Sequence, residues 1–213
     1  MKLEEFLKRV RGLPVIDAEN LLAGVTNLAP VKVQLSRWCK FGKLIKLKNN
    51  IYLLAESFRK MDIYEPYIAS VLKKPSYISL QKAFEYHGLI PEGVPVYTCV
   101  TTKRPGKVTT LIGTFDYRHI KNGLFWGYNS FTVNKQQVAF IATPEKALLD
   151  FFYLKGLQID EGYLEEMRLQ NVRKINISRL MEYAKRFRNP GILRAAQIIK
   201  KYAAKRKKEE KQL

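Results

Sequence analysis

The residues best suited to chemistry in this sequence are basic, and they gather where acidic residues are missing. Between Glu19 and Glu56 the chain has no aspartate or glutamate, although it has six lysines and arginines. These six are Lys32, Arg37, Lys40, Lys43, Lys46 and Lys48. Because an ordinary solvated surface mixes both signs of charge, this window predicts a polyanionic partner. A lysine-rich surface without a partner is the alternative.

The spacing of these residues suits DNA recognition. If residues 30–41 form a helix, a turn of about 100° per residue gathers one polar arc. That arc holds Lys32, Val33, Ser36, Arg37 and Lys40. The first four are placed to reach base edges in a major groove. The residues suited to phosphate contacts are Lys40, Lys43, Lys46 and Lys48, with Asn49 and Asn50 at the tip of the next hairpin. On the opposite side we expect Trp38 as core, flanked by Phe41.

Catalytic chemistry has little support in the sequence. His87 precedes a glycine and is typical of a helix C-terminal cap, and no nucleophile or metal-ligand spacing surrounds His119. Asp150 lies four residues after Lys146 and is expected to form an ion pair with it. No phosphate-cradling glycine loop is present. We therefore predict no enzyme, no cofactor and no metal site.

The composition indicates a folded chain. Its 213 residues carry a net charge of +19, and 46 % of them are hydrophobic, enough for a packed core. Two cysteines alone make neither a disulfide framework nor a zinc site. No apolar run approaches the roughly 18 residues that a membrane span needs, and the N-terminus lacks the apolar segment of a secretory signal. We expect a cytoplasmic protein without a membrane partner.

The elements that must position the basic window form a winged helix-turn-helix in residues 1–60. Helices are predicted at 3–11, at 18–23 (capped by Asp17 and ended by Gly24) and at 30–41, with Gly42 as the stop. A hairpin over 43–54 turns at Asn49-Asn50, because asparagine tolerates positive φ. Its expected register puts one apolar set on a shared face and Lys46 and Lys48 on the other. That set is Ile45, Leu47, Tyr52 and Leu54.

The rest of the chain predicts a linking helix and a mixed α/β domain. The linker covers residues 61–74, with a helix at 62–72 interrupted near its start by Pro66. Residues 75–213 should hold a small, mainly antiparallel sheet and C-terminal helices. Helices are expected at 80–87 (capped by Ser79), 143–154, 160–170, 177–187 and 191–206, and strands at 94–101, 109–115, 123–128, 130–133 and 137–141. The fold class is α+β.

A second basic face is a further candidate. Lys103, Arg104 and Lys107 surround a turn, and the last 58 residues carry 15 basic and 7 acidic residues. These could bind nucleic acid together, or the turn could simply be solvated. The tail at 205–211 is too charged to fold alone. The aromatic residues Phe125, Trp126 and Tyr128 are expected inside the sheet rather than stacked on RNA bases.

Several ordered motifs resemble the AbiEi family of antitoxins, the transcriptional regulators of type IV toxin–antitoxin pairs. The resemblance covers nearly the whole chain. It rests on Trp38 with Phe41-Gly42-Lys43-Leu44 and Ile51-Tyr52-Leu53, on Pro75-Ser76-Tyr77-Ile78-Ser79-Leu80, on His87-Gly88-Leu89, and on Ile141-Ala142-Thr143-Pro144-Glu145-Lys146-Ala147-Leu148-Leu149-Asp150. The last of these is the most specific, although it could equally be a structural helix start.

The resemblance implies a winged helix that represses its own operon by binding inverted repeats in the promoter. It also implies a C-terminal domain that counteracts a nucleotidyltransferase-like toxin without a stable complex, the protein being a monomer or a DNA-induced dimer. It supplies no residue for the neutralising activity. Two other classes stay open: an RNA-binding protein that uses its basic C-terminal helices, and an enzyme acting on nucleic acid.

Overall fold

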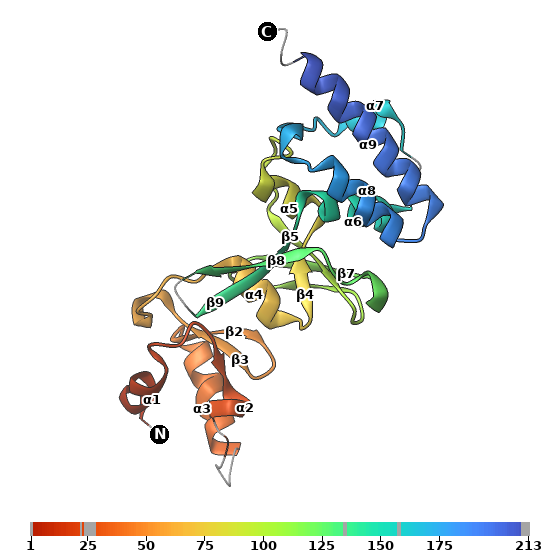
Figure 1. The fold of residues 1–213 in the computed structure, drawn as a ribbon. Helices are drawn as coiled ribbons and strands as arrows, with labels where there is room; N and C mark the ends of the chain where they lie inside the picture. Colours follow the sequence, from red (N-terminus) through yellow and green to blue (C-terminus); the bar gives the residue numbers. More distant parts are fainter. Residues whose placement is uncertain (1, 22, 24–28, 134–135, 157–158, 210–213) are drawn as a thin grey trace.

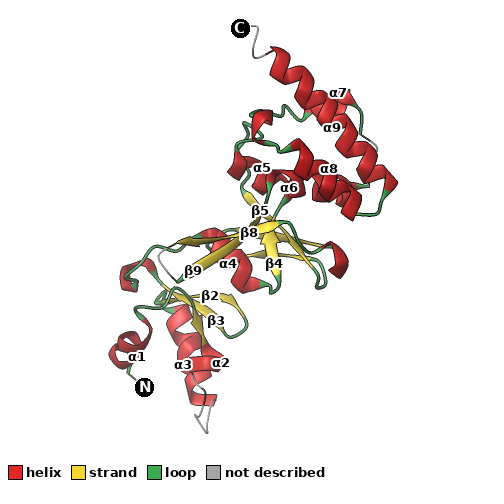
Figure 2. Ribbon diagram, in the orientation of Figure 1, coloured by secondary structure: helices red, strands yellow, loops and turns green. Residues whose placement is uncertain are grey.

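The protein is an α+β structure of three stacked parts, seen in a computed structural model (Figure 1). The structure describes residues 2–21, 23, 29–133, 136–156 and 159–209. A small N-terminal unit of helices and three strands lies at one end, a six-stranded sheet in the middle, and a helical layer at the C-terminal end (Figure 2). None of the described helices combines the length and apolar character needed to cross a membrane.

The N-terminal unit contains α1 (Leu3–Val10), β1 (Ile16–Asp17), α2 (Ala18–Leu21), α3 (Ala29–Lys40), β2 (Leu44–Lys48) and β3 (Ile51–Leu54). The predicted helices and hairpin are confirmed, and Asp17 caps α2 by accepting the Glu19 N–H at 3.0 Å. The expected stop of this helix at Gly24 lies outside the described residues. The strand β1, absent from the prediction, pairs with β3 and completes an antiparallel sheet of order β1-β3-β2.

The predicted register of the hairpin is wrong by one residue. Lys48 pairs with Ile51 across the Asn49-Asn50 turn, but a bulge at Leu47 shifts the pairing beyond it. Lys46 therefore faces Tyr52, and Ile45 faces Leu53. Because successive residues of a strand point to opposite faces, the slip moves the β3 side chains to the other face. Tyr52 and Leu54 pack in the N-terminal core, with Leu44, rather than beside Ile45 and Leu47.

The central sheet has the order β6-β7-β5-β4-β9-β8. Its strands are β4 (Ser76–Ile78), β5 (Val96–Thr101), β6 (Gly106–Thr109), β7 (Thr114–His119), β8 (Tyr128–Val133) and β9 (Gln137–Ala142). The pairs β5–β7 and β4–β9 are parallel and the other three are antiparallel. The strand predicted at 109–115 is wrong, because a turn at Thr110–Gly113 separates β6 from β7. Residues 122–124 form a short 3-10 helix instead of the strand predicted at 123–128.

The central sheet and the helical layer together form what we call the second unit. Its helices are α4 (Glu65–Leu72), α5 (Leu80–His87), α6 (Pro144–Lys155), α7 (Glu161–Glu166), α8 (Ile177–Arg186) and α9 (Pro190–Glu209). Pro66 lies in the first turn of α4 and does not interrupt it. The helix expected as a linker buries Ile68, Ala69 and Leu72 in the main core. The last helix continues through Lys205–Lys208, part of the tail expected not to fold alone, whereas Lys211 lies outside the described residues.

Candidate nucleic-acid interface

Helix α3 is held by its buried arc and by a closed C-terminus. Leu35 and Trp38 are buried, and the Trp38 ring lies 4.7 Å from the Phe6 ring of α1. Gly42 adopts φ +66°, which lets the Lys43 N–H donate to the Trp38 carbonyl at 2.8 Å. This bond turns the chain from α3 directly into β2. The opposite arc of α3 is thereby fixed toward solvent.

The solvent-facing arc is the predicted one. It consists of Lys32, Val33, Ser36, Arg37 and Lys40, all of them exposed. Within the described residues, its three cations form no ion pair. Cations without acidic partners give a field of one sign along the helix, which suits a polyanion.

The hairpin offers fewer side chains for contact with DNA phosphates than its sequence predicts. Lys46 and Asn49 are exposed and Lys43 is half-buried. Lys48 instead donates from Nζ to the Leu72 carbonyl at the C-terminal end of α4, at 3.0 Å. The Asn50 side-chain amide donates to Glu19 Oε1 at 2.6 Å, and the Asn50 backbone carbonyl accepts the Ala18 N–H at 2.8 Å. The tip of the hairpin is thus tied back to both α2 and α4.

The charge of Lys46 affects the thiol of Cys39 near the C-terminal end of α3. Burial raises the pKa of the Cys39 thiol, and the neighbouring Lys46 ammonium partly opposes that shift. The slipped register places Lys46 on the same face of the hairpin as Tyr52, on the side where α3 packs. Lys46 therefore lies close to Cys39 of α3, on the face of the hairpin against which α3 packs.

Phe41 is more exposed than the sequence predicts. It was expected beside the apolar side of the helix, but it is 71 % exposed. Its N–H donates to the Arg37 carbonyl at 2.9 Å, so the helical path continues to Phe41 and puts it next to Arg37 and Val33. Because Gly42 ends the helix there, no core surface is left for the ring to cover. An exposed aromatic side chain at this position can pack on a base or a sugar.

The second basic face lies far from this arc along the chain. Lys103, Arg104 and Lys107 are exposed, and the carbonyl of Arg104 accepts a bond from Lys73 Nζ at 2.8 Å. The final helix, which could extend this face, packs against α6, α7 and α8, and the union of the two remains a prediction. Lys107 instead lines a cavity of about 740 Å³ with Arg118 and Lys155.

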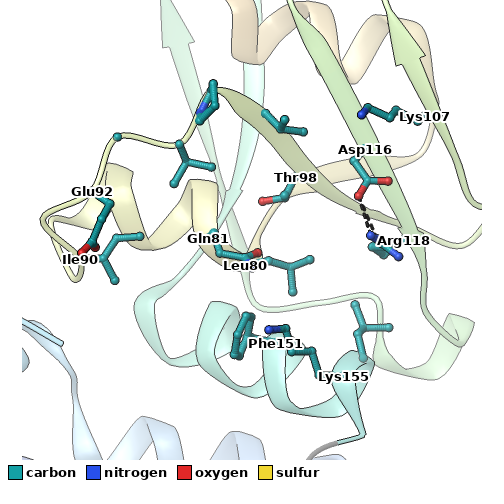
Figure 3. Close-up of a pocket in the computed structure, with 15 residues that line it drawn as sticks. Leu80, Gln81, Ile90, Glu92, Thr98, Lys107, Asp116, Arg118, Phe151 and Lys155 are labelled. Carbon is teal, nitrogen blue, oxygen red and sulfur yellow. Dashed lines mark hydrogen bonds and ion pairs between the residues drawn. The ribbon is translucent and has the colours of Figure 1, made fainter. Parts of the chain in front are cut away.

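Figure 3 shows this cavity between the start of α5, the strands β5 and β7, and the end of α6. Leu80 of α5 and Phe151 of α6 line it with apolar side chains, and Thr98 of β5 also contributes to the lining. Arg118, on one wall, forms an ion pair with Asp116 at 2.8 Å. Much of the positive charge of the cavity is thus neutralised by its own lining.

A buried charged centre joins the sheet to the helical layer. Lys146 and Asp150 of α6 form the predicted ion pair, with both side chains fully buried. Tyr77 and Ser79 donate to Asp150 Oδ2 at 2.8 and 2.9 Å, and Lys146 donates to the Tyr77 hydroxyl at 2.9 Å. Ser79 precedes α5, as predicted, but its hydroxyl bonds Asp150 instead of capping the helix.

The electrostatics of this centre follow from its burial. Burial lowers the pKa of the Lys146 ammonium and raises that of the Asp150 carboxyl, and each partner opposes the shift of the other. Burial also raises the pKa of the Tyr77 hydroxyl, with Asp150 adding to the effect. With no exposed atom, the centre meets no substrate in this conformation, and its geometry is that of a structural junction.

Aromatic rings enclose this centre. Tyr128 stacks on Tyr77 at 4.8 Å, Phe125 lies 5.0 Å from Tyr77, and Lys146 Nζ lies 5.0 Å from the Trp126 ring. Gly127 adopts φ +78°, and a Cβ there would come within 2.9 Å of Lys146 Cγ. The three aromatic residues were expected inside the sheet, but they are half-buried, and Phe125 and Trp126 belong to a loop rather than to a strand.

The two histidines have carbonyl partners. His87 Nε2 lies 2.7 Å from the Ala142 carbonyl, and His119 Nδ1 lies 3.2 Å from the Lys103 carbonyl. Burial lowers the pKa of His87. Among the described residues no group of three or more histidine, cysteine or acidic side chains could hold a metal ion.

Comparison with known proteins adds no assignment. No protein-family model matches the chain, and no curated protein matches it significantly.

Proposed function

We propose that this protein is a non-enzymatic, DNA-binding antitoxin that represses its own operon. One observation carries the DNA-binding part: the polar arc of α3 presents Lys32, Arg37 and Lys40 to solvent without acidic partners in the described chain. A helix followed by a short antiparallel hairpin is a geometry that docks in the major groove.

In this proposal the side chains of α3 and the hairpin fall into two groups, those that contact base edges and those that contact phosphates. Arg37 can bond the O6 and N7 atoms of guanine bidentately, Ser36 can serve several bases, and Val33 can meet a thymine methyl group. Lys40, Lys43 and Lys46 suit phosphates. Because Lys48 bonds the Leu72 carbonyl, it contacts DNA only if that bond opens.

Gel-shift titration of the full chain with duplex DNA from upstream of its own gene tests this assignment. Arg37→Ala combined with Lys46→Ala should weaken binding at least about 30-fold, because each lost charged contact is worth about 1–3 kcal/mol. The matched control, Lys103→Ala with Lys107→Ala, removes the same charge outside α3 and the hairpin and should change affinity less than about threefold. An equal loss of DNA affinity in both variants would show that only net charge matters and would refute the assignment of the α3 arc as the surface that recognises DNA.

The salt dependence gives an independent check. Five cations, Lys32, Arg37, Lys40, Lys43 and Lys46, are available to each DNA half-site. If the three lysines assigned to phosphate, Lys40, Lys43 and Lys46, each make one contact, the slope of log affinity against log salt should be about −3 per protomer. A slope near zero would remove the electrostatic basis of the proposal.

The antitoxin part rests on the ordered family motifs. In this proposal the second unit counteracts a nucleotidyltransferase-like toxin, encoded beside this gene, without a stable complex. Co-expression of that neighbouring gene with the full chain should restore growth, whereas the two proteins should not co-purify. Growth arrest that the full chain does not relieve would exclude this role.

RNA binding is the second candidate, and one observation favours it. The last turns of α9 expose Lys201, Lys205, Lys207 and Lys208 on one element. Filter binding of labelled single-stranded RNA compares this candidate with the first. If RNA binding were the main activity, Lys201→Ala with Lys207→Ala would weaken it and the α3 variant would not.

A further inference from the structure

A second cavity, of about 420 Å³, lies between α4 and the edge of the sheet formed by β8 and β9. This volume is within the range of small-molecule sites. Four aromatic side chains line it: Tyr67 from α4, Phe125 from the loop before β8, Tyr128 from β8 and Phe140 from β9. Nothing in the proposed DNA-binding or antitoxin role uses this cavity.

The aromatic wall is held rigid from behind. The rings of Phe125 and Tyr128 lie 5.3 Å apart, and those of Tyr128 and Phe140 lie 5.8 Å apart. Tyr128 stacks on Tyr77, whose hydroxyl is fixed by the buried pair of Lys146 and Asp150. A wall that is already ordered loses little freedom when a ring packs on it.

The cavity has few polar side chains, and one of them, Ser76, already donates its hydroxyl to the Lys73 carbonyl at 2.6 Å. Ser70 is 9 % exposed, and its hydroxyl has no hydrogen-bond partner in the described part of the chain. Ser70 is absent from the buried side-chain atoms without a partner, so this oxygen keeps access to solvent and is free to bond a ligand. Lys74 lies at the rim, exposed and free of ion pairs among the described residues.

The charge of the lining selects an anion. No described residue of this cavity is acidic. In the larger cavity, by contrast, Asp116 neutralises Arg118. Beside α5, a third cavity of about 320 Å³ contains Lys82 together with its ion-pair partner Glu85.

We propose that the cavity between α4 and β8–β9 binds a mononucleotide. The base packs against Tyr67, Tyr128 and Phe140, its polar edge meets the Ser70 hydroxyl, and the phosphate pairs with Lys74. A planar ring with hydrogen-bonding edges and one anionic group matches these features together. This site goes beyond the proposed function and does not depend on it.

Isothermal titration calorimetry of the full chain with AMP, GMP, CMP and UMP tests the site. At least one nucleotide should bind at submillimolar concentration. Adenosine and ribose 5-phosphate, which lack the phosphate and the base respectively, should each bind more than about tenfold more weakly than AMP. Equal binding of ribose 5-phosphate and AMP would mean that surface lysines alone hold phosphate, and would overturn the proposal.

Variants locate the binding. Lys74→Gln lies at the surface and should weaken nucleotide binding about tenfold while leaving adenosine unchanged. Val71→Trp, from the α4 wall, should block the cavity and abolish both. The matched control Lys107→Gln lines the larger cavity and should have no effect. Binding by none of the four nucleotides, or affinity unchanged in Lys74→Gln, would overturn the site irrespective of any result with DNA.

Discussion

At the scale of the residue, Lys146 and Asp150 are the least replaceable pair that we find in the described chain. Removing one partner leaves the other charge buried and uncompensated. Lys146→Met should therefore lower the free energy of unfolding by about 3–5 kcal/mol. Adding Asp150→Asn should recover part of that loss, because the amide keeps its bonds to Tyr77 and Ser79. Chemical denaturation followed by circular dichroism measures both effects.

The control for this pair is Lys155→Met, which removes an exposed lysine from the end of the same helix. It should change the free energy of unfolding by no more than about 0.5 kcal/mol. If Lys146→Met were as mild as Lys155→Met, the buried pair would not be a structural junction.

His87 makes stability depend on pH. Its folded pKa lies below the ordinary 6.5, first because of burial and also because of the Lys174 charge, while the Ala142 carbonyl and Glu145 oppose the shift. Since the unfolded chain takes up the proton first, stability should fall as the pH drops from about 6.5 toward the folded pKa. Melting temperatures between pH 7.5 and 5 measure this loss. His87→Gln should reduce the loss, whereas His119→Gln, at an exposed position, should keep it.

At the scale of the element, the Gly42 turn fixes how α3 meets β2. A Cβ at Gly42 would touch nothing within 4 Å, so the cost of a side chain comes only from φ +66°. Gly42→Ala should lower the stability of the N-terminal unit by about 1–2 kcal/mol. Gly12→Ala is the matched control, because that glycine also has open space but no positive φ. Urea denaturation compares the two, and equal effects would rule out strain as the cause.

Elements with strong local signals could be predicted from the sequence. The cap at Asp17, the stops at Gly42 and Gly88, and the Thr143-Pro144 helix start are local chemistry, and the structure bears them out. The exposed arc of α3 followed from helical periodicity alone. The bulge at Leu47 could not be predicted, because it depends on which core each face of the hairpin meets. Phe41 was misplaced for a similar reason: the end of the helix decides its surroundings.

Contacts between side chains that are distant in the sequence could not be predicted from the sequence. The Lys146–Asp150 pair was expected from its spacing, but its burial under Trp126 and its bonds to Tyr77 and Ser79 join residues about 70 positions apart. The engagement of Lys48 with Leu72 is likewise a contact between distant segments. The sequence predicted that Lys48 contacts phosphate. Only the folded structure shows that its ammonium already bonds the Leu72 carbonyl.

At the scale of the whole molecule, the hairpin belongs to two cores at once. Leu44, Tyr52 and Leu54 pack with α1 and α3, while Leu47 and Leu53 are buried in the core of the second unit. Helix α3 is therefore oriented relative to the sheet by a shared element rather than by a flexible linker.

This sharing predicts that residues 1–60 do not form an independent domain. A fragment cut at residue 60 exposes Leu47 and Leu53, whose burial is worth about 1.5–3 kcal/mol each. A unit of 60 residues has little stability to lose. We expect the fragment to unfold below the melting temperature of the full chain, without a sharp transition, and to bind a hydrophobic dye.

Leu47→Gln in the fragment should reduce dye binding without further loss of helix, whereas in the full chain the same substitution should lower the stability. A fragment that melts cooperatively at the temperature of the full chain and binds no dye would instead establish residue 60 as a true domain boundary.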